Sequence, residues 1–234
     1  MSNSPSKVVG VMGGMGPAAT LHFLQALLAA TPAERDQDHL RVLVDNDPHM
    51  PDRNAALTGG GPSPGPRLAA MAQGLERAGA EVLVMPCNTA HAFQAEIEVA
   101  IAIPFLSIVE ATVDAAFANA PGLAAVGLLA APGCLRAGLY QDAFAARGVR
   151  TIAPQGELNA RLYALIYRIK AGEVGPDSRA EMSAIAHALI DQGADALASA
   201  CTEAPLVLGA RDVPVPLIDS TEALAAATVA FAAR

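Results

Sequence analysis

The sequence predicts an α/β protein made of two similar doubly wound parallel-sheet domains that are related by a pseudo-twofold axis. The first observation behind this is that short apolar runs alternate with Ala/Leu-rich amphipathic stretches along the chain. Such βαβ alternation is typical of parallel sheets covered by helices on both faces. The second observation is that the two halves of the chain echo each other. A site is then expected in the cleft between the domains, because ligands of open α/β sheets bind at the carboxyl ends of the strands.

The elements of the first half are predicted in order from local pattern. We expect alternating strands and helices at residues 7–12 (strand), 17–30 (helix), 40–45 (strand), 67–78 (helix), 81–85 (strand) and 89–100 (helix). A Gly-rich turn at 13–16 closes the first strand, and Pro17 suits the first turn of the helix that follows. The segment 58–66 (TGGGPSPGP) is too rich in Gly and Pro for regular structure, and it is a candidate lid over an active site.

Three pairs of similar segments, one member from each half, indicate the duplication. They are 79–87 (GAEVLVMPC) with 193–201 (GADALASAC), 9–14 (VGVMGG) with 126–131 (VGLLAA), and 103–106 (IPFL) with 215–218 (VPLI). The offsets within these pairs are 114, 117 and 112 residues, which is close to a single repeat length. We therefore expect a first domain over residues 1–113, a second over 114–216, and a C-terminal helix within 217–234 that returns to the first domain.

Composition narrows the function class. The chain has 234 residues, of which 53% are hydrophobic, and a formal net charge of −8. An acidic surface argues against a nucleic acid or an anionic membrane as partner, and an anionic substrate would need a local group of cations. Three cysteines are too few for a disulfide framework or a four-ligand zinc site. We expect a cytoplasmic protein with reduced thiols and no metal.

Two of the three cysteines, Cys87 and Cys201, occupy equivalent positions of the repeat, each just after a predicted strand. A pseudo-dyad would let these thiols face each other across the cleft. Such a pair suits a two-base proton transfer, in which one thiolate removes a proton and the other thiol returns one to the opposite face. A helix N-terminus after each cysteine would lower the thiol pKa and bind a carboxylate. A single buried cysteine is more often inert, and Cys134, without a partner in the repeat, is expected to be structural.

Other local patterns are ambiguous by themselves. The glycines at 10–16 lack the spacing of a dinucleotide fingerprint and a Walker lysine, so they predict a tight turn beside the substrate. Cys87 and His91 have helical i, i+4 spacing, but no third metal ligand is evident, and we expect His91 to form a hydrogen bond near the site. Glu203 follows Cys201 by two residues. It could tune that thiol, bind a substrate ammonium group or stabilise the start of a helix.

Five motifs along the chain carry a resemblance to a known family. They are Gly13–Thr20 (GGMGPAAT), Asp47–Arg53 (DPHMPDR), Met85–His91 (MPCNTAH), Lys170–Gly172 (KAG) and Ala200–Glu203 (ACTE). In their order and spacing the chain resembles the PLP-independent aspartate/glutamate racemases, and within them the aspartate racemase branch. The resemblance extends from Val9 to Ala226.

The resemblance implies two α/β domains with the site between them, no PLP or other cofactor, no metal, a homodimer and a small acidic amino acid as substrate. It implies Cys87 and Cys201 as the acid/base pair. The positions implied for substrate binding are Met15, Gly16, Arg53, Asn88, Thr89, Lys170, Thr202 and Glu203. Among them, Arg53 and Lys170 match carboxylate-binding positions, and two cations for one small molecule favour a dicarboxylate.

Two departures from the family pattern leave the exact substrate open. The segment 130–134 (AAPGC) stands where the family usually has a hydroxyl-rich loop, and Asp47 stands where it often has Asn, which adds a negative charge near Arg53. The predicted function is interconversion of L- and D-aspartate or a related acidic amino acid. The alternatives are a hydantoin racemase, a maleate isomerase or a non-catalytic dicarboxylate-binding protein. Arylmalonate decarboxylase is disfavoured because that branch needs only the second cysteine.

Overall fold

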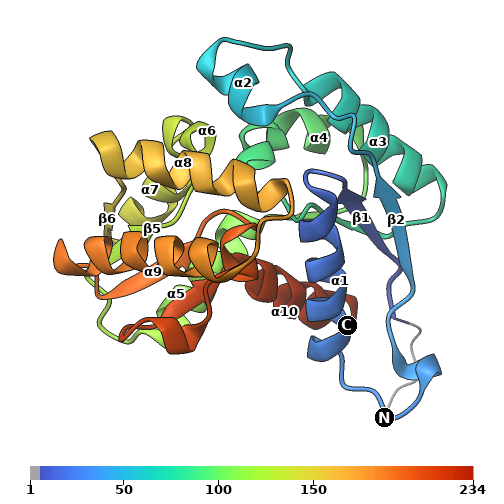
Figure 1. Ribbon diagram of the computed structural model, residues 1–234. Helices are drawn as coiled ribbons and strands as arrows, with labels where there is room; N and C mark the ends of the chain where they lie inside the picture. The colour runs from blue at the N-terminus through green and yellow to red at the C-terminus, as the bar shows by residue number, and fades with distance from the viewer. Residues whose placement is uncertain (1–5, 234) are drawn as a thin grey trace.

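The computed structural model describes residues 6–233, and each half of the chain forms one parallel sheet of four strands (Figure 1). The strand order is β2-β1-β3-β4 in the first sheet and β6-β5-β7-β8 in the second. The strand bounds are β1 (Val9–Gly13), β2 (Val42–Asn46), β3 (Val82–Val84), β4 (Phe105–Leu106), β5 (Ala125–Leu128), β6 (Arg150–Ile152), β7 (Ala196–Ser199) and β8 (Leu217–Asp219). Because successive strands take the same order in both sheets, the predicted α/β fold with two similar halves is confirmed.

Helices connect the strands and cover the sheets. Their bounds are α1 (Pro17–Ala30), α2 (Arg53–Thr58), α3 (Gly65–Arg77), α4 (Gln94–Ala100), α5 (Ile108–Asn119), α6 (Pro132–Arg136), α7 (Leu139–Ala145), α8 (Gly156–Lys170), α9 (Pro176–Asp191) and α10 (Ser220–Ala232). The predicted helix 89–100 is instead a 3₁₀ helix, η2 (Thr89–Phe93), followed by α4. In this turn the His91 backbone N–H bonds to the Asn88 carbonyl oxygen at 3.0 Å, which is the i→i+3 pattern of a 3₁₀ helix, and the His91 imidazole bonds to the Cys87 carbonyl oxygen at 2.9 Å.

The helix that follows the last strand of each sheet packs on the other half. α5 comes after β4 but packs against β7, β8 and α7, and α10 comes after β8 but packs against α1, β3 and β4. One core cluster therefore contains residues of both sheets, such as Val84 and Val126. The division into domains at 1–113 and 114–216, with 217–234 returning to the first, stays a proposal. α5 spans that boundary, and residues 1–5 and 234 lie outside the described part of the chain.

A glycine occupies an equivalent place in the first strand of each half. A Cβ added at Gly10 in β1 would lie 2.5 Å from Leu83 Cδ2, and one at Gly127 in β5 would lie 2.6 Å from Leu197 Cδ2. Neither position has room for a side chain, because a leucine of the neighbouring strand packs directly over the glycine. The two halves therefore use the same packing arrangement at matching places, which agrees with the sequence repeat.

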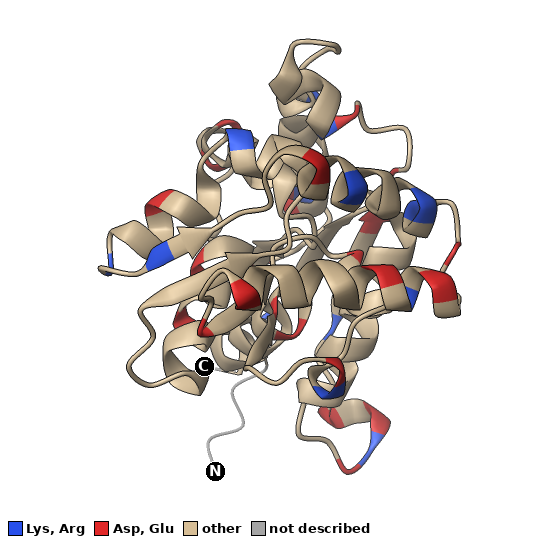
Figure 2. Cartoon of the chain, turned by 60° about the vertical axis from the view of Figure 1, so that its left-hand side comes forward, with Lys and Arg blue, Asp and Glu red and all other residues tan. Residues whose placement is uncertain are grey.

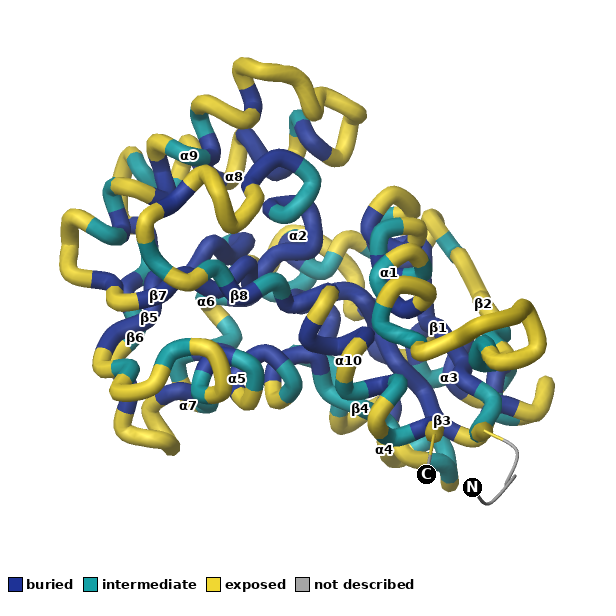
Figure 3. Tube along the Cα trace, turned by 90° about the horizontal axis from the view of Figure 1, so that it is seen from below, coloured by how far each residue is buried: buried dark blue, intermediate teal, exposed yellow. Residues whose placement is uncertain are grey.

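The central strands are buried, as expected for parallel strands covered on both faces. Every residue of β1, β3, β5 and β7 is buried, whereas the edge strand β2 is partly exposed (Figure 3). The charged residues lie mainly on helices and loops (Figure 2). Among residues 6–233, no helix has both the length and the apolar character needed to cross a membrane.

Candidate functional site

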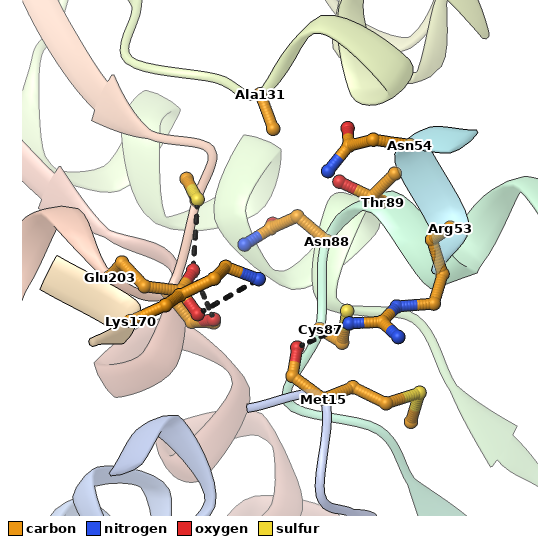
Figure 4. Close-up of a pocket in the computed structure, with 11 residues that line it drawn as sticks. Met15, Arg53, Asn54, Cys87, Asn88, Thr89, Ala131, Lys170 and Glu203 are labelled. Carbon is orange, nitrogen blue, oxygen red and sulfur yellow. Dashed lines mark hydrogen bonds and ion pairs between the residues drawn. The ribbon is translucent and has the colours of Figure 1, made fainter. Parts of the chain in front are cut away.

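A small cavity lies where residues of the two halves meet (Figure 4), and its volume is about 270 Å³ including the part that opens to solvent. Its walls are formed by Met15, Arg53, Asn54, Cys87, Asn88, Thr89, Ala131, Lys170, Cys201, Thr202 and Glu203. The structure thus brings together every residue that the sequence predicted for the site except Gly16. Gly16 lies in an adjoining outer pocket, which also contacts Arg53, Lys170 and Glu203.

The two cysteines of the cavity come from matching places in the two halves. Cys87 follows the central strand β3 of the first sheet, and Cys201 follows the central strand β7 of the second. Their exposed fractions are 6% and 5%, and both thiols are free. The third cysteine, Cys134, is packed in the apolar core and is absent from the cavity wall. Burial raises the pKa of Cys134 to about 12, so this thiol stays protonated and is structural in character.

Cys201 is in direct contact with a carboxylate. Its Sγ donates a hydrogen bond to Glu203 Oε2 at 3.0 Å, and Lys170 Nζ forms an ion pair with Glu203 Oε1 at 3.4 Å. Burial raises the pKa of Cys201 well above its usual range, and the negative charge of Glu203 raises it further. The expectation that a helix N-terminus would lower this thiol pKa is therefore wrong for Cys201. Only a short 3₁₀ helix, η3 (Ala204–Leu206), follows it, and burial, with the Glu203 carboxylate second, sets the direction of the shift.

Lys170 keeps its positive charge in the cavity wall. Burial is the largest influence and would by itself lower the pKa of this ammonium group, but the Glu203 carboxylate together with the sulfur atoms of Cys201 and Cys87 outweighs it, and the net pKa is raised. Lys170 is the last residue of α8, and Figure 4 shows its side chain beside Glu203, on the opposite side of the cavity from Cys87. The second half of the molecule thus supplies a thiol, a carboxylate and an ammonium group that touch one another in sequence.

Arg53 is the second cation of the cavity. It is the first residue of α2, whose start is stabilised by the side chain of Asp52 accepting a hydrogen bond from Ala55 N at 2.8 Å. The Arg53 guanidinium donates to the backbone carbonyls of Met50, Pro51 and Met15 at 3.1, 2.9 and 3.4 Å. Within the described chain it forms no ion pair with a carboxylate. Its charge is therefore positioned by neutral groups and is available to an anion.

The negative charge of Asp47 is compensated away from the cavity. Asp47 forms an ion pair with Arg67 at 2.7 Å and accepts a hydrogen bond from His49 N at 2.9 Å. It does not line the cavity. The negative charge that Asp47 was expected to add near Arg53 is therefore paired with Arg67, outside the cavity wall. The backbone of Asp47 does explain one glycine, because a Cβ at Gly14, which has a φ of +91°, would lie within 2.3 Å of it.

The side chain of Asn88 is held by residues of later elements. Its Oδ1 accepts a hydrogen bond from the hydroxyl of Tyr140, and its Nδ2 donates to Ser220 Oγ at 3.1 Å. Tyr140 belongs to α7 and Ser220 to α10, and both are fully buried. The Tyr140 hydroxyl oxygen also lies 3.2 Å from Thr112 Oγ1. A buried network of this kind fixes the amide in one orientation beside Cys87.

His91 connects the turn after Cys87 to the start of α5. Its Nε2 accepts a hydrogen bond from the N–H of Ile108 at 3.1 Å, so the proton of the neutral ring lies on Nδ1, which donates to the Cys87 carbonyl at 2.9 Å. The predicted role of His91 in backbone hydrogen bonding is confirmed. Within the described residues, no cluster of three or more His, Cys, Asp and Glu side chains could hold a metal ion.

The neutral state of His91 predicts a pH dependence of stability. Burial lowers its pKa from 6.5 to about 4, so between these values the unfolded chain binds a proton that the folded protein does not. The neutral His91 side chain therefore contributes fully to the free energy of unfolding above pH 6.5. This contribution is lost as pH falls towards 4, by about 3 kcal/mol in total. We expect His91→Asn to be less stable than the wild type at pH 7, with the difference shrinking at pH 4.5. Urea unfolding at both pH values measures this, with exposed His187→Asn as control. A difference independent of pH would contradict it.

Sequence reasoning missed one residue of the cavity wall, Asn54, and anticipated Ala131 only as part of the segment 130–134. Asn54 directly follows Arg53 in α2, but a short helix gives no periodic signal that tells which residues face a cleft. Ala131 lies in the segment 130–134, where the family usually has a hydroxyl-rich loop. The part of the cavity wall that Ala131 forms therefore carries no hydroxyl group. The Gly/Pro-rich segment 58–66, the candidate lid, lines neither the cavity nor the outer pocket in this structure.

Comparison with known proteins agrees with this geometry. A family model described as Asp/Glu/Hydantoin racemase matches residues 12–228. The structure is similar to that of Picrophilus torridus aspartate racemase, with a TM-score of 0.86 and 32% identity over 97% of this chain and 94% of that one. A broad specificity amino-acid racemase from Bacillus subtilis is 29% identical over 95% of this chain and 96% of its own length. The glutamate racemase of Francisella tularensis shares the fold alone, with a TM-score of 0.70 at 20% identity over 94% of this chain and 78% of that one.

Proposed function

The chain belongs to the Asp/Glu/Hydantoin racemase family, and on this premise we propose that it interconverts L- and D-aspartate, or a related acidic amino acid, by a cofactor-independent two-base mechanism. Family membership confirms the expected enzyme class, an isomerase of the amino-acid racemase type. The predicted homodimer and cytoplasmic location stay predictions.

One observation carries the proposal: two free thiols from matching places in the two halves line one small cavity. In the proposed reaction, the thiolate of one cysteine takes the α-proton, and the thiol of the other gives its proton to the opposite face of the carbon. The product is the mirror-image amino acid, and the two cysteines have exchanged protonation states. Because Cys201 carries its proton towards Glu203, we assign it the role of acid and Cys87 the role of base in the first half-cycle.

The charges of the cavity support an acidic substrate. Apart from the thiols, its ionised side chains are Arg53, Lys170 and Glu203, which together carry one excess positive charge. An acidic amino acid has a second carboxylate that a neutral amino acid lacks, and the Arg53 guanidinium, which within the described chain is bonded only to backbone carbonyls, can bind it. Since Glu203 offsets Lys170, we propose that Arg53 binds the side-chain carboxylate. The similarity to an aspartate racemase over nearly the full chain supports the same substrate class.

A second candidate is a racemase that also accepts neutral or larger amino acids. Two observations favour it: Ala131 gives the cavity an apolar wall, and the outer pocket, of about 800 Å³ including open space, continues past Arg53 along Met50, Ile169 and Leu206. A bulkier side chain could extend there. The similarity to a broad specificity racemase supports this alternative as well.

We expect the wild-type protein to exchange the Cα–H of aspartate with solvent and to invert it. The test is incubation in D2O with reduced thiols, using L-aspartate, D-aspartate, L-glutamate and neutral amino acids in turn. Proton NMR follows loss of the Cα–H signal, and chiral chromatography follows inversion. Exchange with inversion on a neutral amino acid but not on aspartate would replace the first candidate by the second. No exchange on any amino acid would favour a binding protein or a different branch of the family.

A further inference from the structure

Asn54 joins the two halves of the molecule at the cavity wall. It lies in α2, its exposed fraction is 6%, and its Oδ1 accepts a hydrogen bond of 2.9 Å from the backbone N–H of Gly133 at the start of α6. A backbone N–H can only donate, so the oxygen of the Asn54 amide must face Gly133. The amide nitrogen is thereby turned the other way. Figure 4 shows it pointing towards Thr89 and Asn88.

The surroundings of Asn54 fix this orientation and leave the nitrogen without a protein partner. A Cβ at Gly133 would lie 2.7 Å from Asn54 Oδ1 and 3.0 Å from Thr89 Cγ2, so the glycine makes room for the amide. Within the described chain, no hydrogen bond is formed by Asn54 Nδ2. Because Asn54 lines the cavity, this N–H group is available to a ligand there. The neighbouring wall at Ala131 offers no side-chain donor, which leaves the Asn54 amide and the Thr89 hydroxyl as the donors on this side.

We propose that Asn54 binds substrate directly, with its Nδ2–H donating a hydrogen bond to the α-carboxylate of the amino acid. This inference rests on the proposed racemase function. Figure 4 shows Asn54 and Thr89 on one side of the cavity and the Arg53 guanidinium on another, near Cys87. With the side-chain carboxylate at Arg53, the α-carboxylate lies towards Asn54. When the α-proton leaves, negative charge spreads into that carboxylate, so a fixed donor there stabilises the transition state more than the ground state.

Two substitutions separate this role from a purely structural one. Asn54→Asp keeps an oxygen that can accept from Gly133 but replaces the donor by a negatively charged oxygen. Asn54→Ala removes both. If Asn54 donates to the α-carboxylate, kcat/KM falls about tenfold to a hundredfold in Asn54→Ala and further in Asn54→Asp, and the latter loss diminishes as pH is lowered from 8 to 5. If Asn54 only joins α2 to α6, Asn54→Asp stays close to the wild type and Asn54→Ala is the more impaired, which would overturn the proposal.

A control and a second measurement make the test independent of folding and of substrate. Thr58→Ala changes another side chain of α2 that bonds only to the backbone of its own helix, and it should leave kcat/KM unchanged. In the wild type, the Asn54 side-chain amide protons, assigned by their absence in Asn54→Ala, should move downfield when substrate is added; unmoved protons would refute the contact. Because every amino acid has an α-carboxylate, the test uses whichever amino acid the wild type exchanges. A failure of the aspartate assignment is therefore distinct from a failure at Asn54.

Discussion

Replacing Cys87 or Cys201 by alanine is expected to lower the rate of racemisation by about 100- to 10,000-fold in each case, which is the usual contribution of a positioned acid or base. The reason is that inversion needs a proton taken from one face and a proton delivered to the other, and each face has one thiol. Chiral chromatography of the product formed from L- and D-aspartate measures the loss. Thermal unfolding of each variant shows whether the fold is kept.

The two variants should differ in which enantiomer they still exchange with solvent. A variant with one thiol left can remove and return a proton on the same face, which gives exchange without inversion. We expect Cys87→Ala to incorporate deuterium into one enantiomer and Cys201→Ala into the other. Cys134→Ala is the matched control, because this cysteine is equally buried but lies outside the cavity. Full racemisation by either single variant would eliminate the two-thiol mechanism.

The fold was predictable because the repeat imposed the same pattern twice. Segments 79–87 and 193–201 are buried central strands followed by a turn, and burial on both faces makes such strands uniformly apolar. The repeat also placed Cys87 and Cys201 at matching strand ends without any knowledge of distances. Local sequence therefore determined the strands, their order of appearance and the pairing of the thiols.

The features that sequence missed depend on contacts between elements far apart in the chain. The bond from Gly133 to Asn54 joins α6 to α2, and no periodicity within a helix of this length encodes it. The prediction of a lowered pKa for the Cys201 thiol was wrong for the same reason. Its pKa depends on burial and on how the Glu203 carboxylate folds back to it under the attraction of Lys170. Likewise, the motif placed the negative charge of Asp47 near Arg53, whereas in the fold Asp47 forms an ion pair with Arg67 of α3.

Arg53→Ala is expected to raise KM for aspartate by about 10- to 100-fold, the size expected for losing charge-assisted hydrogen bonds to a carboxylate. The guanidinium has no carboxylate partner within the described chain, so its substitution removes the cation free to bind the substrate side chain. KM for a neutral amino acid such as alanine should change far less, since that substrate has no distal carboxylate. Steady-state kinetics on both substrates give the change in KM for aspartate and for alanine, and the ratio of these two changes shows whether Arg53 binds the side-chain carboxylate.

The choice of controls for Arg53 follows from its bonds to three backbone carbonyls. Because Arg53→Ala also releases these, Arg53→Lys provides a variant that keeps the positive charge but loses the two parallel donors, and its KM for aspartate should lie between the wild type and Arg53→Ala. Arg77→Ala removes an exposed arginine in the last turn of α3, outside the cavity, and it should leave both KM values unchanged. An equal rise of KM for aspartate and alanine in Arg53→Ala would remove Arg53 from side-chain recognition. It would then favour the racemase of broader specificity, because the cavity would retain no unpaired cation that distinguishes an acidic side chain from a neutral one.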